Sequence, residues 1–301
     1  MNEQTLPFLR WAGGKRWVAP YLAPAIRKTL EQRYIEPFLG SAAMFFAIQP
    51  ESAILGDLNE ELINVYRQVR RAPHRMEEQL AGLSVDANTY YKIRAEEPQR
   101  AMDRAVRFIY LNRLCFGGLH RTNRKGQFNV PYGGGSRTPE LVYRDHLLGH
   151  AARLLRRRGT SLVACDFASV IDRAQEGDVI FCDPTYRSAG RGRFDRYGPL
   201  IFSWSDQIRL ANAVKSARRR GAVSIVMNVD DRDVVALYPD SIFVHLARRK
   251  AIGNTQKTAD SHREVIAILD PLRRKQFWSE ICSSILRRFS PTEPDAIRGA
   301  A

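Results

Sequence analysis

The chain has 301 residues, of which 44% are hydrophobic and 26% are charged, and these shares are typical of a globular protein with one or two domains. No apolar run is long enough to span a bilayer, the N-terminus lacks a signal-peptide pattern, and the four cysteines form no CxxC pair. These features exclude the integral-membrane class, give a metal site or disulfide framework little support, and favour a reducing cytoplasm.

The charge of the chain indicates a class of partner. The 47 basic and 32 acidic residues give a net charge of +15 and an isoelectric point near 10.0. Such an excess favours nucleic acid, because neutralising phosphates releases counterions. A membrane surface is the weaker alternative, because no basic amphipathic helix with Trp and Phe on its apolar face stands out.

The first predicted elements lie between residues 34 and 71. The text YIEPFLGSAA predicts a short strand ending near Glu36, a turn over residues 37–40 and a helix from about Ser41. A second strand closes at Asp57, and residues 59–71 have helical periodicity. The order strand, helix, strand predicts the start of a doubly wound sheet.

Later segments complete an α/β pattern. Residues 72–150 are rich in Arg, Tyr and Asn, are helical at first and then contain a loop punctuated by Gly and Asn. Sheet signals return after them, at residues 160–167, 178–184, 222–229, 241–247 and 263–269, with a helix at 205–220 between two of them.

We therefore expect three parts. Residues 1–71 and 151–270 would form an α/β core, and residues 72–150 an inserted, mostly helical lobe. Residues 271–301 would be a basic helix, at 275–289, followed by a flexible tail.

The first candidate motif is FLRWAGGK, in which Trp11, Gly13 and Lys15 lead into a helix. Backbone N–H groups there could meet an anionic ligand, and Lys15 could pair with a carboxylate or a phosphate. A P-loop is excluded because Arg16 follows the lysine. Taken alone, the motif is better explained as a turn that carries a solvated lysine.

The second candidate is EPFLG followed by GDLN. Gly40, after the first strand, would let a ligand approach the backbone, and Asp57 could accept hydrogen bonds from ribose hydroxyls. An alternative that explains Asp57 about equally well is an N-cap for the helix at 59–71. Because GxGxxG is absent, a nicotinamide cofactor has little support.

The third candidate is CDPTY, which follows an apolar strand. An exocyclic amine that attacks a methyl donor needs two acceptors for its hydrogens, so that its lone pair faces the incoming carbon. The Asp183 carboxylate and the Pro184 carbonyl can supply them, while Tyr186 can stack on a base that has been flipped out of the duplex. A plain Asp-Pro turn is the common alternative, and EPFLG upstream favours the chemical interpretation.

Together these motifs resemble one family, the Dam-like, D12-class DNA adenine N6-methyltransferases. The similarity runs from Phe8 to about Leu269 and includes FLRWAGGK, EPFLGSAA, GDLNEELINVY, CDPTY and the stretch YLNRLCFGGLHRTNRKGQFNVPYG. It implies a doubly wound, Rossmann-like methyltransferase sheet with an inserted DNA-recognition lobe. It also implies site-specific transfer of a methyl group from S-adenosylmethionine to N6 of a flipped adenine in double-stranded DNA.

The resemblance also assigns residues. It implies catalytic roles for Asp183, Pro184 and Tyr186. The cofactor would lie against Trp11, Gly13, Lys15, Glu36, Phe38, Gly40, Asp57, Asp166, Phe167 and Asp183. Within that set, Lys15 would lie near the cofactor's carboxylate, Asp57 would hold its ribose, and Asp166 and Phe167 would flank its adenine. No metal is implied.

On the DNA side the resemblance implies contacts by six residues of the recognition stretch: Arg113, Phe116, Arg121, Asn123, Arg124 and Lys125. Arg121 is the best base-reading candidate, Arg124 and Lys125 suit phosphates, and an aromatic can fill the space that a flipped base leaves. For any single arginine here, a solvated loop charge is an equally good explanation. Expected partners are double-stranded DNA and a cognate restriction endonuclease, with no membrane, for a monomeric, cytoplasmic, DNA-associated enzyme.

Two positions depart from the family pattern. Ala42 stands where the cofactor loop usually has a second glycine, and Thr185 where the tetrad often has proline. Alanine disfavours positive φ, so the loop could lie differently. The alternatives that stay open are an N4-cytosine or RNA adenine methyltransferase, a non-catalytic DNA-binding relative and a nicotinamide oxidoreductase.

Overall fold

The computed structural model describes residues 7–11, 13–123, 125–135, 137–142, 146–185, 202–248 and 262–289. Its centre is a seven-stranded sheet in the order β3-β2-β1-β4-β5-β7-β6. Strands β1 to β5 pair in parallel, whereas β7 is antiparallel to both β5 and β6. The strands are β1 (Tyr34–Glu36), β2 (Ala53–Asp57), β3 (Ser161–Ala164), β4 (Val179–Cys182), β5 (Val223–Val229), β6 (Ile242–Arg248) and β7 (His262–Leu269). The predicted α/β sheet is thus confirmed.

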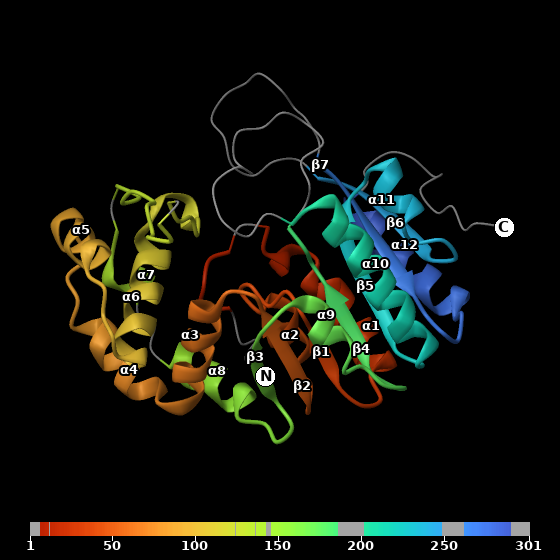
Figure 1. Cartoon of the computed structure of the whole chain (residues 1–301), viewed down its shortest axis with the longest axis horizontal. Helices are drawn as coiled ribbons and strands as arrows, with labels where there is room; N and C mark the ends of the chain where they lie inside the picture. The colour runs from red at the N-terminus through yellow and green to blue at the C-terminus, as the bar shows by residue number, and fades with distance from the viewer. Residues whose placement is uncertain are drawn as a thin grey trace.

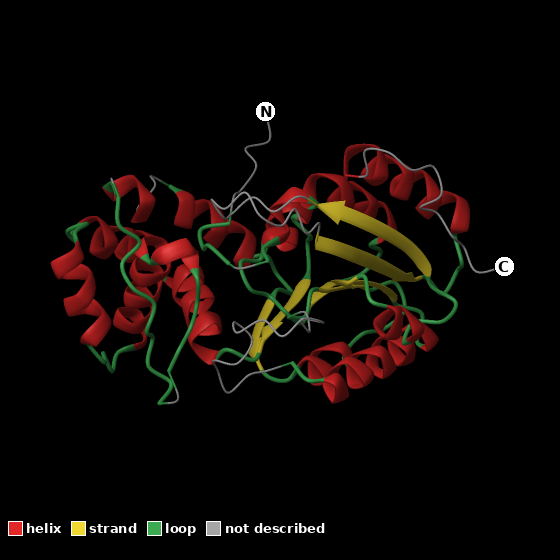
Figure 2. Ribbon diagram, turned by 90° about the horizontal axis from the view of Figure 1, so that it is seen from above, coloured by secondary structure: helices red, strands yellow, loops and turns green. Residues whose placement is uncertain are grey.

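Both faces of the sheet are covered by helices (Figure 2). The central strands are apolar on both faces, as parallel strands between helix layers must be. One face, with Tyr34 and Phe181, packs in a core with α1 (Ala19–Thr29), α2 (Ala43–Ile48), α3 (Glu60–Arg71) and α12 (Lys275–Phe289). The other, with Ile35 and Ile180, packs on α9 (Phe167–Ile171), α10 (Trp204–Arg219) and α11 (Arg232–Ala236).

The remaining helices lie between α3 and β3 and form a group to one side of the sheet (Figure 1). They are α4 (Pro73–Ala81), α5 (Ala87–Ala95), α6 (Ala101–Leu114), α7 (Pro139–Val142) and α8 (Leu147–Leu155). After α6 comes the 3-10 turn η2 (Phe116–Gly118), and two isolated bridges, Cys115 to Tyr132 and Thr122 to Phe128, fold the following loop back on itself. The expected boundary after residue 150 falls inside α8.

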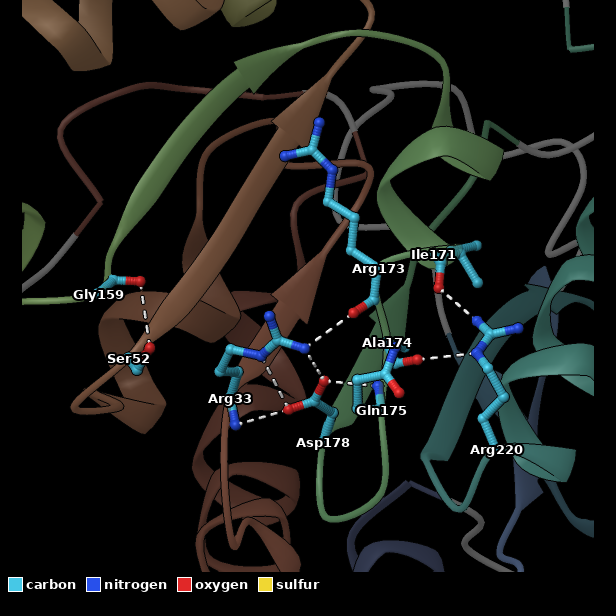
Figure 3. A network of polar contacts seen from close by, with 9 residues as sticks. All are labelled: Arg33, Ser52, Gly159, Ile171, Arg173, Ala174, Gln175, Asp178 and Arg220. Atoms are coloured by element: carbon cyan, nitrogen blue, oxygen red, sulfur yellow. Dashed lines mark hydrogen bonds and ion pairs between the residues drawn. The ribbon is translucent and has the colours of Figure 1, made fainter.

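A polar network ties the strands together at their amino ends (Figure 3). The buried Asp178 carboxylate, just before β4, accepts hydrogen bonds from the backbone N and the guanidinium of Arg33, just before β1, at 2.7–3.2 Å. It also accepts one from Gln175 N. Arg220 donates to the carbonyls of Ile171 and Ala174 beneath α9. The hydrogen bonds between Asp178 and Arg33, called the clamp below, align β1 with β4. The strand order reverses between these two strands. In such sheets ligands bind at the carboxyl ends of the strands at this point.

Two properties concern the described residues only. No helix among them combines the length and apolarity needed to cross a bilayer. In the same part of the chain, no group of three or more His, Cys, Asp and Glu side chains is arranged to hold a metal ion. The predicted tail after Phe289 lies outside the described residues.

Candidate active site

A cavity of about 710 Å³ opens at the carboxyl ends of β1, β2 and β4. Four segments far apart in the sequence contribute to its wall: the N-terminal loop, the turn after β1, the end of β2 and the residues after β4. Eleven of the predicted residues line it, namely Trp11, Gly13, Lys15, Glu36, Phe38, Gly40, Asp57, Asp166, Phe167, Asp183 and Pro184. The open space therefore joins the predicted catalytic carboxylate to the loop at residues 11–15.

Lys15 is a buried cation in the wall of this cavity. It begins the 3-10 turn η1 (Lys15–Trp17), and only 3% of its surface is exposed. Its Nζ lies 2.8 Å from Asp183 Oδ1, donates to the Gly13 carbonyl at 2.8 Å, and lies 3.9 Å from Glu264 Oε2. A buried ammonium requires such partners. The solvated-lysine interpretation is therefore wrong, and Glu264, on β7, is a partner of Lys15 that the sequence analysis missed.

Asp57 is fixed by two backbone donors at the end of β2. Its Oδ2 accepts from Gly40 N at 3.1 Å and its Oδ1 from Asn59 N at 2.9 Å, while burial raises the pKa of the carboxyl group. The N-cap of α3 is Asn59, whose side chain accepts from Leu62 N, so the alternative role of Asp57 as that cap is wrong. A carboxylate has about four acceptor sites, so it keeps acceptor capacity for a ligand.

Gly40 leaves room for an aromatic ring. Its φ is +46°, and a Cβ at this position would lie 2.8 Å from Cδ1 of Trp11. The left-handed backbone favours glycine here, and the approach of the indole leaves no room for a Cβ. Two residues later, the buried Ala42 adopts φ +55° at the N-cap of α2. Ala42, where the family pattern usually has glycine, thus adopts left-handed backbone.

Glu36 is a buried acid in the floor of the site. Its Oε2 accepts a hydrogen bond from the Tyr34 hydroxyl at 2.9 Å and one from Phe45 N at 3.2 Å. Burial raises the pKa of Glu36 to about 8, and the negative charges of Asp183 and Asp57 act in the same direction. These effects outweigh the two hydrogen bonds, so Glu36 is mostly protonated at neutral pH.

One end of the cavity has an aromatic wall. Phe38 stacks on Phe167 with ring centres 5.3 Å apart and an angle of 25°, and Phe202 packs 5.6 Å from each of them. Beside the rings, Asp166 caps α9 by accepting from Ala168 N, and Arg209 of α10 pairs with the same carboxylate at 2.7 Å. The sequence analysis missed Phe202, which lies just before α10, and Arg209, which lies on that helix, because neither residue belongs to a motif.

Trp11 connects the cavity to the loop after α6. Its indole stacks on His120, with ring centres 5.6 Å apart and an angle of 20°, and His120 in turn stacks on Phe108 at 5.0 Å. Burial lowers the pKa of His120 to about 4, so this ring is neutral. The sequence analysis missed His120, which lies in the cavity wall directly before Arg121.

The predicted DNA contacts that fall within the described residues, Arg113, Phe116, Arg121, Asn123 and Lys125, do not line this cavity. Phe116 is 60% exposed. Arg121 donates through Nε to Asn129 Oδ1 at 2.8 Å, and the Asn123 side chain accepts from Lys125 N and Gln127 N, as a turn residue does. Arg113 ends α6. The placements of Tyr186 and Arg124 fall outside the described residues.

Comparison with known proteins identifies the family. Residues 11–253 match the D12 class N6 adenine-specific DNA methyltransferases. The chain is 31% identical over 243 residues to a type II methyltransferase of Lactococcus lactis subsp. cremoris, covering 78% of this chain and 84% of that protein. It is 31% identical over 277 residues to a DNA adenine methylase of Haemophilus influenzae, covering 87% and 93%.

A third relative is the DNA N-6-adenine-methyltransferase of Escherichia phage P1, which is 34% identical over 270 residues, or 86% of this chain and 35% of that longer protein. The seven-stranded, mostly parallel sheet agrees with a Rossmann-like methyltransferase fold. The chain belongs to the D12 class of N6 adenine-specific DNA methyltransferases.

Proposed function

We propose that the enzyme methylates N6 of a flipped adenine at a specific site in double-stranded DNA, with S-adenosylmethionine as the methyl donor. The observation that carries this proposal is the single cavity shared by Asp183, Pro184, Asp57 and the loop at residues 11–15. A cofactor and an extruded base must meet in one space, and this cavity supports that arrangement.

The cavity suits S-adenosylmethionine in size and chemistry. Its volume, about 710 Å³, is in the range for a ligand of that size. Phe38 and Phe167 would hold the flat adenine, and the Asp57 carboxylate the ribose hydroxyls. Lys15 is in reach of a carboxylate at the other end. When bound, the cofactor supplies an electrophilic methyl group on a sulfonium sulfur.

Asp183 and Pro184 would orient the target amine. Asp183 Oδ1 lies 2.8 Å from Lys15 Nζ. This ion pair holds the carboxylate of Asp183 in place. A carboxylate held in this way can accept one amine hydrogen, and the Pro184 carbonyl can accept the other, so that the nitrogen lone pair faces the methyl donor. Acceptors placed in advance stabilise the positive charge that develops on nitrogen.

A covalent route through cysteine is disfavoured. Cys182 is next to Asp183 in sequence, but it is fully buried, and burial raises the pKa of its thiol well above the usual value. The nucleophile is the amine itself in this proposal. Tyr186 would stack on the flipped base, a role that rests on the family motif.

The helical group from residue 72 to 150 would recognise DNA. Its exposed Phe116 suits a wedge that fills the space of the flipped base. Arg121, already oriented by Asn129, suits a guanine edge, while Arg113, Asn123, Arg124 and Lys125 suit further contacts to DNA. The net charge of +15 supports attraction to the duplex.

The cellular setting is part of the proposal. Relatives include type II methyltransferases and proteins named DNA adenine methylase. A monomeric, cytoplasmic enzyme that protects DNA from a cognate restriction endonuclease fits the first group, and a solitary enzyme the second.

The test is to identify the methylated nucleoside. The purified enzyme is incubated with double-stranded DNA and S-adenosylmethionine, and the DNA is digested and analysed by mass spectrometry. The proposal expects N6-methyladenine in one sequence context. N4-methylcytosine, methylation of RNA alone, or the absence of any product despite DNA binding would each contradict it.

A further inference from the structure

Arg209 lines the cavity, and the proposed function gives it no role. It lies in the second turn of α10, lines the cavity together with the aromatic rings, and keeps 49% of its side chain exposed. Nothing in the motif pattern singles it out, because none of the three candidate motifs lies on α10. Its position beside the predicted adenine end of the cofactor calls for an explanation.

Two carboxylates hold the guanidinium of Arg209. Nη2 lies 2.7 Å from Asp166 Oδ1, and Nη1 lies 2.8 Å from Asp206 Oδ1. Asp206 is itself fixed, because it forms a capping box with Ser203 at the start of α10. The guanidinium carbon also lies 4.9 Å from the centre of the Phe167 ring. A side chain held at three points has its plane determined before any ligand arrives.

The Asp166–Arg209 pair presents two kinds of polar group side by side. Asp166 offers oxygen lone pairs, of which the bonds to Ala168 N and Arg209 use only part. Arg209 has five N–H donors, and its two ion pairs leave donors for a ligand. An acceptor next to a donor matches the edge of adenine, where an amino group lies beside a ring nitrogen acceptor. It opposes a 6-oxopurine, whose edge carries an acceptor beside a donor.

We propose that Arg209 is a specificity-determining residue that reads the purine of the cofactor together with Asp166. This inference rests on the proposed function, because it takes the aromatic end of the cavity as the site of the cofactor's adenine. In it, Asp166 accepts from the amino group, Arg209 donates to the adjacent ring nitrogen, and the Phe38 and Phe167 rings hold the base plane. Asp206 holds Arg209 in position for this role.

The experiment measures binding without DNA and without methyl transfer. Calorimetry gives the affinities of S-adenosylhomocysteine and of its 6-oxo counterpart, S-inosylhomocysteine, for the wild-type enzyme. We expect the amino ligand to bind at least about tenfold more tightly, the range of one or two hydrogen bonds to charged groups.

The decisive variant is Arg209→Met, which keeps an unbranched stem beside Phe167 but removes the donors. Its affinity for S-adenosylhomocysteine should fall by about tenfold, and its preference for the amino ligand should fall below about threefold. Arg209→Lys, which keeps the charge but cannot bridge both carboxylates, should also lose much of the preference. Arg219→Met, an exposed site in the last turn of the same helix, should behave as wild type.

The outcomes separate the inference from the proposed function. If the wild-type enzyme binds neither ligand, the proposed cofactor site is wrong and the inference falls with it. If it binds both equally, or if either Arg209 variant keeps the full wild-type preference, the role of Arg209 is overturned while the cofactor site stands. Thermal unfolding of each variant shows that the compared proteins are folded.

Discussion

Gly40→Ala tests the geometry of the cofactor loop. At φ +46° an added Cβ costs about 1–2 kcal/mol, because left-handed backbone is unfavourable for L-residues. It would also lie 2.8 Å from Cδ1 and 3.0 Å from Nε1 of Trp11. Such overpacking adds about 1–3 kcal/mol. We therefore expect the free energy of unfolding to fall by about 2–5 kcal/mol.

A matched control separates the two costs. Gly134 has φ +64°, but no described atom lies within 4 Å of the position of its Cβ, so Gly134→Ala carries the backbone cost alone. Urea unfolding followed by circular dichroism gives the free energy of unfolding of both variants. Calorimetry should show weaker binding of S-adenosylhomocysteine by Gly40→Ala only, because the added Cβ pushes Trp11 into the cavity. If the two variants lose equal stability and bind equally, the claimed contact between Gly40 and Trp11 is wrong.

Three further outcomes are expected. Asp178→Ala should lower the free energy of unfolding by about 3–5 kcal/mol in urea titrations, because Arg33 and Gln175 N lose a buried acceptor; a loss below about 1 kcal/mol would contradict the clamp. The pKa of Glu36 is raised from 4.5 to about 8, so between these pH values the folded state keeps a proton that the unfolded chain releases. The free energy of unfolding should therefore fall as pH rises across this window, by at most about 1.4 kcal/mol per pH unit. Glu36→Gln should flatten that slope, and identical slopes would refute the assignment. Phe116→Ala, at an exposed position, should change stability by less than about 0.5 kcal/mol yet reduce the fluorescence gain of 2-aminopurine placed at the target adenine; an unchanged gain would exclude the wedge.

The strands and the ends of the strands were the predictable part of the molecule. The run before Asp183 is apolar at every position because β4 is buried on both faces, and this pattern is visible without coordinates. Parallel strands end at one edge, so Asp57 and Asp183 could be expected near each other. Both residues line the same cavity.

The missed residues depend on packing that leaves no local pattern. Glu264 reaches Lys15 only because β7 pairs antiparallel with β5, a long-range event. Arg209 lines the cavity because of how α10 is rotated about its own axis. The amphipathic pattern of α10 is too weak to predict that rotation from the sequence. Gly40 was predicted to admit a ligand, but the atoms nearest to its missing Cβ belong to Trp11, and only three-dimensional structure could identify them.

The central claim is that Asp183 orients the amine for methyl transfer, and single-turnover methylation by Asp183→Ala tests it most directly. We expect a loss on the order of 1,000-fold or more in the rate, with DNA affinity close to wild type. Cys182→Ala, at the adjacent buried position, should keep methylation within about tenfold, because its thiol takes no part in the chemistry. Methylation by Asp183→Ala at a rate near that of wild type would contradict the account.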